Sequence, residues 1–258
     1  MSAAFPASTR DWVATDLDGT LFSRHWADEN AIPGTWREIT SQDGSKQREP
    51  SSWVRPETHR LLLALAKTMS IVPVTARDVA SFSRVDVPGL RLRAPAILAN
   101  GAIVLGLDGA PDQRWVARVS EVLVPWRQNL ERLCEILIQR SGHIARPRLV
   151  AGPAELPAYL VAKAPDGWWV GAEGTALRKV IAAQATAECS VVVMGNELQV
   201  LPLGLGKAAA LRFIQKHYFN GQAPLLCLGD QLSDLEFMRM GGQLATPAGS
   251  PLAEIWAS

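Results

Sequence analysis

Short apolar runs alternate with stretches of helical periodicity along most of the chain. Four runs have the length of a buried strand and end in polar residues or a turn signal, namely 12–15, 70–74, 96–99 and 224–228. Helices are predicted from Pro56, where leucines form an apolar stripe, and over residues 207–216. Strands that alternate with helices predict an α/β fold with a mainly parallel, Rossmann-like sheet.

The middle of the chain has a different order of elements. A helix over about residues 119–140 precedes two strands, and a second helix over about 175–188 precedes two more. The expected strands lie near residues 148–151, 159–164, 191–194 and 198–201. This order predicts an α+β domain with helices on one face of a mainly antiparallel sheet. We therefore expect a core of residues 1–111 and 195–258, interrupted by an inserted domain at 112–194.

A polar segment over residues 23–52 follows the first strand and is rich in Gly, Pro, Ser and charged residues. This composition is typical of chain that runs over the surface. We expect an excursion near the end of the first strand, which could cover a site or carry an interface.

The composition is that of a globular protein, with 48% hydrophobic and 20% charged residues. A net charge of +1 indicates no basic face for nucleic acid and no polybasic segment for a membrane. Cys134, Cys189 and Cys227 lack metal-binding spacing, and we interpret them as buried free thiols. The first residues lack the charged and then apolar pattern of a signal peptide, so a cytoplasmic location is expected.

Reactive side chains follow three of the predicted strands. Asp16 and Asp18 follow the first, Thr75 follows the second, and Asp230 and Asp234 follow the last. Alternation directs the first two carboxylates to one side, where they repel each other unless a cation or a proton intervenes. Any one of these residues could be an ordinary helix cap. Together they favour a ligand site, because open α/β sheets bind ligands at the carboxyl ends of their strands.

The residue types indicate phosphate chemistry. An ionised carboxylate can attack phosphorus, but a phosphate dianion repels it unless a cation lies between them. Asp16, Asp230 and a main-chain carbonyl form a hard-oxygen set that suits Mg²⁺. Lys207 supplies a fixed positive charge, and the hydroxyl of Thr75 supplies a donor. Asp18 can then protonate the leaving oxygen and later take a proton from water.

The order of these motifs resembles that of the haloacid dehalogenase-like phosphatases across nearly the full chain. The matching segments are Asp16-Leu17-Asp18-Gly19-Thr20, Thr75, Lys207 and Gly229-Asp230-Gln231-Leu232-Ser233-Asp234. The long insert, Thr75-Ala76-Arg77 and Asn100-Gly101-Ala102 resemble the sugar-phosphatase branch with an α/β cap. Sucrose-phosphate, trehalose-phosphate and mannosyl-phosphoglycerate phosphatases belong to that branch.

The resemblance implies a role for each core motif. Asp16 would be the nucleophile and Asp18 the general acid and base. The magnesium ion would lie at Asp16, Asp18 and Asp230, and the phosphate at Thr75 and Lys207.

The same resemblance implies supporting roles for three further residues. Asp234 would orient either the water shell of the metal or Lys207. Arg77 and Asn100 are candidates to contact substrate beside the phosphate, although Arg77 is equally a partner for a carboxylate.

The expected activity is that of a magnesium-dependent phosphomonoesterase. Its substrate would be a small phosphorylated metabolite, above all a sugar phosphate, and the reaction would pass through a phosphoaspartyl intermediate. A phosphomutase using the same intermediate is an alternative that the motifs do not separate from it. A binding or regulatory protein without turnover is a second alternative, less favoured because Asp16, Asp18 and Lys207 are all present.

Overall fold

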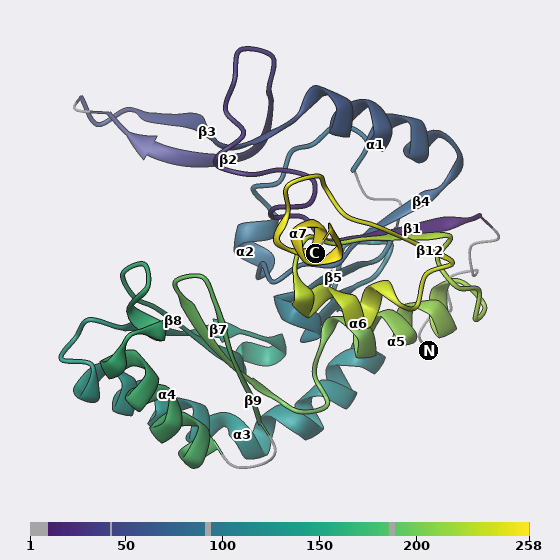
Figure 1. Cartoon of the computed structure of the whole chain (residues 1–258). Coiled ribbons are helices and arrows are strands. Elements are labelled where there is room, and N and C mark those ends of the chain that lie inside the picture. Colours follow the sequence, from purple (N-terminus) through teal and green to yellow (C-terminus); the bar gives the residue numbers. More distant parts are fainter. Residues whose placement is uncertain (1–9, 42, 91–93, 186–188, 258) are drawn as a thin grey trace. The chain divides into compact units, whose positions relative to one another are not determined.

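The computed structural model describes four ranges of the chain, 10–41, 43–90, 94–185 and 189–257. The chain divides into two compact units (Figure 1). The first consists of Met1–Pro111 and Lys207–Ser258, and the second of Asp112–Gly206. Within the four ranges, no helix has both the length and the apolar character that crossing a bilayer requires.

The first unit is built on a parallel sheet with the strand order β12-β11-β1-β4. Its strands are β1 (Trp12–Thr15), β4 (Ser70–Pro73), β11 (Leu226–Leu228) and β12 (Gln243–Ala245). In β1, Val13 pairs with Leu226 on one side and Ile71 on the other. All four residues of β1 are buried, as expected for a central strand covered on both faces.

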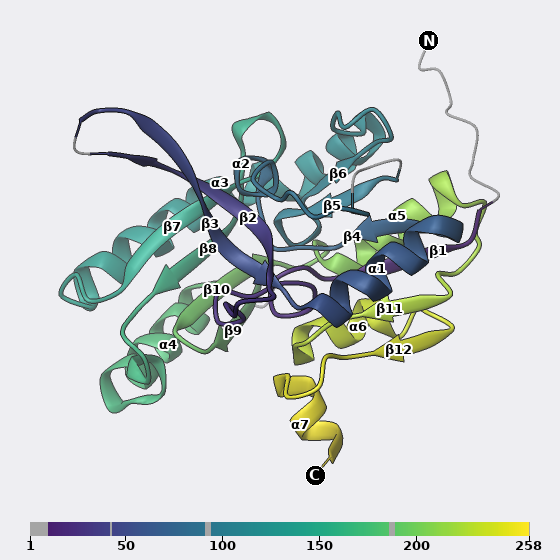
Figure 2. The ribbon, with the colours of Figure 1, turned by 90° about the horizontal axis from the view of Figure 1, so that it is seen from above.

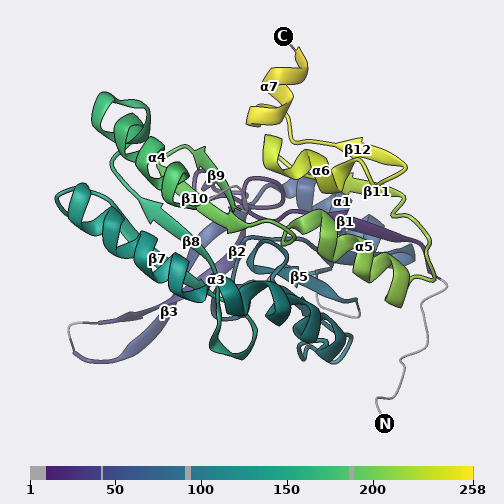
Figure 3. The same ribbon diagram turned by 90° about the horizontal axis from the view of Figure 1, so that it is seen from below.

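Helices cover both faces of this sheet. The helices of the first unit are α1 (Pro56–Thr68), α2 (Val79–Phe82), α5 (Lys207–Tyr218), α6 (Leu235–Met238) and α7 (Pro251–Ala257), of which α1, α5 and α6 flank the sheet. Figure 2 shows α1 on one side of the sheet, and Figure 3 shows α5 and α6 on the other. The expected α/β fold with a parallel core is confirmed.

A hairpin continues the first unit beyond β4. It consists of β5 (Ala96–Leu98) and β6 (Ile103–Leu105), joined by a 3-10 turn over Ala99–Gly101. Val74 forms a parallel bridge with Ile97, which places the start of this hairpin beside the end of β4.

The polar segment after β1 forms a two-stranded ribbon rather than irregular surface chain. Its strands are β2 (Ile32–Thr40) and β3 (Lys46–Val54), paired antiparallel. At its base the hydroxyl of Thr35 hydrogen-bonds to those of Ser51 and Ser52, and Thr35 bridges to Val85. Most side chains on both faces of this ribbon are polar. The sequence therefore lacks the alternation of apolar and polar residues that identifies a strand with one buried face, and it did not predict these strands.

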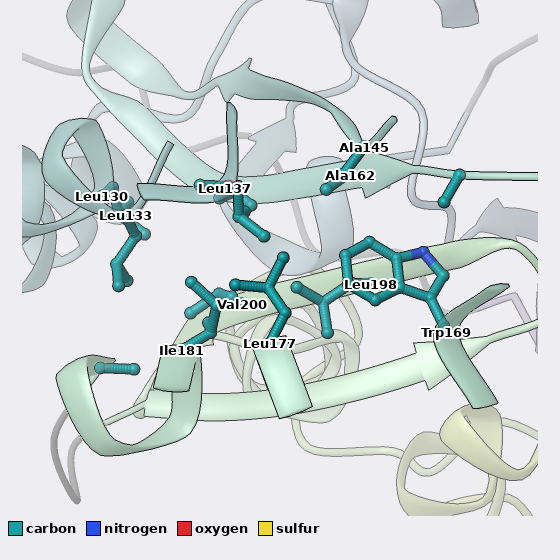
Figure 4. Packing of buried hydrophobic residues seen from close by; sticks show 13 residues of the cluster. Leu130, Leu133, Leu137, Ala145, Ala162, Trp169, Leu177, Ile181, Leu198 and Val200 are labelled. Atoms are coloured by element: carbon teal, nitrogen blue, oxygen red, sulfur yellow. The ribbon is translucent and has the colours of Figure 1, made fainter. Parts of the chain in front are cut away.

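The second unit is an antiparallel sheet in the order β7-β8-β10-β9 with two helices. Its elements are α3 (Gln113–Arg140), β7 (Arg146–Ala151), β8 (Pro157–Lys163), α4 (Ala172–Ala185), β9 (Cys189–Met194) and β10 (Glu197–Pro202). Among the described residues of this unit, 3-10 turns cover Pro153–Glu155 and Trp168–Val170; in the first unit, a 3-10 turn over Leu232–Asp234 precedes α6. Leucines of α3 and Trp169 meet Leu177 and Ile181 of α4 and Leu198 of β10 in one buried cluster (Figure 4).

The second unit extends further than the sequence indicated. It ends at Gly206 rather than at residue 194, because β10 pairs with both β8 and β9. The expected helix over 175–188 corresponds to α4, which begins at Ala172 and is described as far as Ala185; residues 186–188 lie outside the described ranges.

The three cysteines are free thiols. Cys227 is buried in β11, and burial raises the pKa of its thiol to about 12. Cys134 and Cys189 are half-buried and pack against the cluster of the second unit. All three therefore serve as small apolar side chains.

Candidate functional site

The parallel pairing brings the polar strand ends of the first unit to one edge of its sheet. Asp16 follows β1 directly, and its N–H donates to the carbonyl of Leu228 in β11 (2.9 Å). On the other side, the N–H of Val74 donates to the carbonyl of Thr15 (2.8 Å), which places Thr75 at the same edge. The strand order thus accounts for the convergence of motifs that lie far apart in the sequence.

Three buried carboxylates form a compact acidic cluster at this edge. Asp16, Asp230 and Asp234 each offer an oxygen, and these atoms lie within 4.8 Å of one another. Lys207, the first residue of α5, donates from Nζ to Oδ1 of Asp16 and to Oδ1 of Asp234, both at 2.7 Å. One ammonium therefore pairs with two of the three carboxylates.

Asp234 has donors on both of its oxygens. Oδ1 accepts from Lys207, and Oδ2 accepts from the N–H groups of Asp230 (3.2 Å) and Gln231 (3.1 Å). This fixes the carboxylate at the start of the 3-10 turn and, through it, the position of the Lys207 ammonium. Asp234 is thus suited to orienting Lys207.

Asp16 and Asp230 share one hydroxyl donor. Oγ1 of Thr20 lies 3.2 Å from Oδ2 of Asp16 and 3.2 Å from Oδ1 of Asp230. A hydroxyl has a single proton, so it can serve only one of these oxygens at a time. The pair of facing carboxylate oxygens is therefore incompletely satisfied by the protein itself.

The electrostatics of the cluster agree with this geometry. Burial raises the pKa of Asp16 to about 7; Lys207 opposes the shift, and the charges of Asp234 and Asp230 add to it. Burial also raises the pKa of Asp230, together with the charge of Asp234 and against hydrogen bonds from Gln231 and Thr20. Burial alone would lower the pKa of Lys207. The charges of Asp16 and Asp234, and the hydrogen bonds to them, outweigh this effect and hold the pKa above its usual range.

The donor set fits a divalent cation. When all three carboxylates are ionised, one ammonium leaves an excess of two negative charges in a buried cluster, and the available ligands are hard oxygens. Asp16 and Asp230 are the residues best placed to hold such an ion, because their facing oxygens share one proton.

The side chain of Asp18 lies outside the acidic cluster and pairs with Arg77. Nε of Arg77 donates to Oδ2 of Asp18 and its second terminal nitrogen donates to Oδ1, both at 2.6 Å. Asp18 is 55% exposed, whereas Arg77 is 16% exposed and lies over the ring of Phe22 at 5.0 Å. Of the two roles open to Arg77, pairing with a carboxylate is the one observed, and it gives Asp18 a fixed orientation.

Thr75, after β4, and Asn100, in the turn between β5 and β6, are joined by a backbone hydrogen bond beside Arg77. The hydroxyl oxygen of Thr75 accepts from the N–H of Arg77 (3.1 Å). The main-chain carbonyl of Thr75 accepts from the N–H of Asn100 (3.0 Å). Asn100 has a positive φ of 52°, a conformation that asparagine tolerates better than most residues. These two hydrogen bonds connect Arg77 and the end of β4 to the turn between β5 and β6.

Solved structures resemble this chain over most of its length. The sucrose-phosphatase of Synechocystis, solved with sucrose and phosphate, has a TM-score of 0.57 at 16% identity and covers 96% of this chain and 87% of its own. The chain has a haloacid dehalogenase-like fold. The C-terminal domain of Candida albicans trehalose-6-phosphate phosphatase has a TM-score of 0.57 at 14% identity, with coverages of 90% and 74%. A haloacid dehalogenase-like hydrolase from Bacteroides thetaiotaomicron has a TM-score of 0.55 at 11% identity, with coverages of 95% and 91%.

Neither the protein-family models nor the curated protein sequences contain a match to this chain. At 11% to 16% identity, the three structural likenesses establish the haloacid dehalogenase-like fold and no more. Roles of individual residues therefore depend on the geometry described above.

Two residues of the site were present in the first motif without an assigned role. Thr20 supplies the shared hydroxyl, and Gly19 allows Asp230 to approach the chain. A signal for Gly19 existed in the sequence, since a glycine in the turn that follows a buried strand often marks a positive φ or a close approach. The contact of Thr20 with Asp230 spans 210 positions and had no local signal.

Replacement of Gly19 by alanine is expected to disturb the cluster. Gly19 has a φ of +86°, and a Cβ there would lie 2.3 Å from Oδ2 of Asp230. We expect loss of about 1–2 kcal/mol from the left-handed backbone and a further loss from displacement of Asp230, measured as the free energy of unfolding in urea.

Gly44 provides a matched control for this variant. Its φ is +83°, and no atom lies within 4 Å of the corresponding Cβ position. Gly44→Ala therefore isolates the backbone cost. Equal destabilisation by the two variants would contradict the close approach of Asp230.

Proposed function

We propose that the protein is a magnesium-dependent phosphomonoesterase that forms a phosphoaspartyl intermediate on Asp16. The observation that carries this proposal is the incompletely satisfied pair of oxygens on Asp16 and Asp230, beside the ammonium of Lys207. A nucleophilic carboxylate needs positive charge next to it to accept a phosphate dianion. Lys207 supplies one such charge, and the excess negative charge of the cluster favours a bound cation as the second.

A magnesium ion held by Asp16 and Asp230 would neutralise charge on the phosphate and position it for attack. In the first step, a carboxylate oxygen of Asp16 attacks phosphorus and the bond from phosphorus to the alcohol oxygen breaks. Asp18 gives a proton to that leaving oxygen. This role requires one of its oxygens to leave Arg77 and take up the proton first, because both oxygens accept from the guanidinium in this structure.

In the second step, water attacks the phosphorus of the aspartyl phosphate. Asp18 now takes a proton from this water, and the bond from phosphorus to Asp16 breaks to release inorganic phosphate. Lys207 and the turn at Thr75 hold phosphate oxygens in both steps. Each proton that Asp18 gives in the first step is thus recovered in the second.

We further propose that the substrate is a small phosphorylated metabolite, most readily a sugar phosphate. Support comes from the named neighbours, two of which are a sucrose-phosphatase and a trehalose-6-phosphate phosphatase. The test is release of inorganic phosphate from p-nitrophenyl phosphate and a panel of sugar phosphates, with Mg²⁺ and with a chelator. Turnover that survives the chelator, or phosphoryl transfer to a second sugar hydroxyl in place of phosphate release, would contradict the proposal.

Magnesium is also expected to stabilise the folded protein in the absence of substrate. At about 100 times the dissociation constant, a ligand adds about 2.7 kcal/mol, which corresponds to roughly 5–10 °C in melting temperature for a chain of this size. The measurement is a thermal melt with and without Mg²⁺. Asp230→Asn should lose most of the shift, whereas Asp166→Asn, an exposed aspartate of the second unit, should keep it.

A further inference from the structure

The β2–β3 ribbon is attached at its base to the segment that carries Asp18. The N–H groups of Ser23 and Trp53 each donate to the carbonyl of the other, both at 2.9 Å. The chain just after Asp18 is thereby paired with the end of β3. The N–H of Gly19 donates to the carbonyl of Phe22 (2.8 Å), which closes the intervening loop. The position of this loop therefore depends on the ribbon.

The same ribbon is attached to the segment that carries Arg77. The N–H of Asp86 donates to the carbonyl of Gly34 in β2 (3.0 Å). Earlier in this segment, Nη1 of Arg77 donates to the carbonyl of Ser81 in α2 (3.1 Å). The ribbon therefore contacts both of the segments that supply the Arg77–Asp18 pair, and all of these residues belong to the first unit.

The ring of Phe22 lies between the ribbon and the guanidinium of Arg77. Phe22 is fully buried, and Cζ of Arg77 lies over its ring, 5.0 Å from the ring centre. On the ribbon side, a Cβ atom at Gly34 would lie 2.9 Å from Cβ of Phe22 and 3.1 Å from its Cγ. The φ of Gly34 lies outside the left-handed region, so this close approach, and not the backbone conformation, requires a glycine there.

We propose that Phe22 and Gly34 are positioning residues for the general acid. Gly34 allows the ribbon to pack directly on Phe22, and the ring of Phe22 supports the guanidinium that orients Asp18. A guanidinium is attracted to the face of an aromatic ring, and more strongly where water is excluded. The ring can therefore hold Arg77 in place when one oxygen of Asp18 leaves it to take up a proton. This inference rests on the proposed phosphatase function and adds two residues to it.

Two leaving groups separate the positioning of the acid from a general loss of structure. The alkoxide of benzyl phosphate is a strong base and needs a proton to leave, whereas p-nitrophenolate is a weak base and leaves without one. The ratio kcat/KM includes the steps up to departure of the alcohol, so it reports on Asp18 as the acid and not on the later attack by water. For Phe22→Leu, we expect kcat/KM for benzyl phosphate to fall about tenfold or more beyond any fall for p-nitrophenyl phosphate.

Two further variants make this measurement specific. Gly34→Ala displaces the same ring from the ribbon side and should give the same selective loss, so it keeps the test decisive if Phe22→Leu does not fold. Phe219→Leu is the matched control, because Phe219 is equally buried and stacks on Trp12 at the opposite end of β1. It should leave the ratio of the two kcat/KM values unchanged.

A double variant tests whether Phe22 acts through Arg77. Arg77→Met should give the same selective loss, and adding Phe22→Leu to it should cause no further selective loss, because both changes remove one support of Asp18. Additive losses, equal losses for the two substrates, or unaltered protein that turns over p-nitrophenyl phosphate but not benzyl phosphate would overturn this inference alone. Failure of the unaltered protein to release phosphate from either substrate would overturn the proposed function and this inference with it.

Discussion

Replacement of Asp16 by asparagine is expected to lower phosphate release by about 10⁴-fold or more, because loss of a nucleophile removes the covalent pathway. The amide keeps the size of the carboxylate and can still contact Thr20, so the fold should persist. The measurement is the rate of phosphate release from p-nitrophenyl phosphate in the presence of Mg²⁺. Labelling with a phosphorylated substrate should give an acid-stable phosphoprotein in the unaltered chain and none in the variant.

Two comparisons make this result specific. Asp166→Asn changes an exposed aspartate of the second unit and should leave the rate unchanged. Thermal melts of both variants should show a cooperative transition. A rate within about tenfold of the unaltered protein for Asp16→Asn would exclude Asp16 as the nucleophile, since removing a nucleophile costs far more.

Replacement of Lys207 by methionine is expected to destabilise the protein by about 3–5 kcal/mol, because it leaves two buried carboxylates without their shared cation. Nζ of Lys207 is 2.7 Å from both Asp16 and Asp234, and all three side chains are largely shielded from water. For a chain of this size, the loss corresponds to a melting temperature lower by about 6–20 °C. The measurement is a thermal melt without added metal.

Lys216→Met is the control for this variant. Lys216 lies in the last turn of the same helix, is exposed, and should tolerate the change within about 0.5 kcal/mol. If Lys207→Met melts at the temperature of the control, the ammonium does not hold the cluster together. If it melts lower but Mg²⁺ restores most of the loss, a cation can replace the ammonium as counter-charge.

The sequence predicts which residues make up the site, but not which of them pair with one another. Asp16, Thr75 and Asp230 could be placed at one edge because each follows an apolar run of strand length, and parallel strands present their carboxyl ends together. Lys207 was recognisable as the first residue of a helix. The pairing of Asp18 with Arg77 spans 59 positions. It depends on the directions in which the turn after β4 holds its side chains, and no local sequence pattern predicts those directions.

The fold was predictable where burial differs between the faces of an element. The strands β1 and β4 and the helices α3 and α5 carry clear apolar patterns, and the sequence predicted all four, although α3 begins at Gln113 rather than near residue 119. The β2–β3 ribbon has mostly polar residues on both faces, so its strands were missed. The end of the second unit was misplaced because β10 is assigned by its pairing with β8, which is not a property of its own residues.

The pairing of β1 with β11 has a consequence for how the chain folds during its synthesis. Trp12 donates from its indole nitrogen to the carbonyl of Gln222 (3.0 Å), a contact across 210 positions. A ribosome adds about 5–20 residues per second, so one edge of β1 remains unpaired for roughly 10–40 s until β11 has been synthesised. Residues 112–206, by contrast, contain every strand of their own sheet and can complete it first. During that interval the apolar edge of β1 is open to pairing with other nascent chains, and cellular chaperones would act on the first unit at this stage.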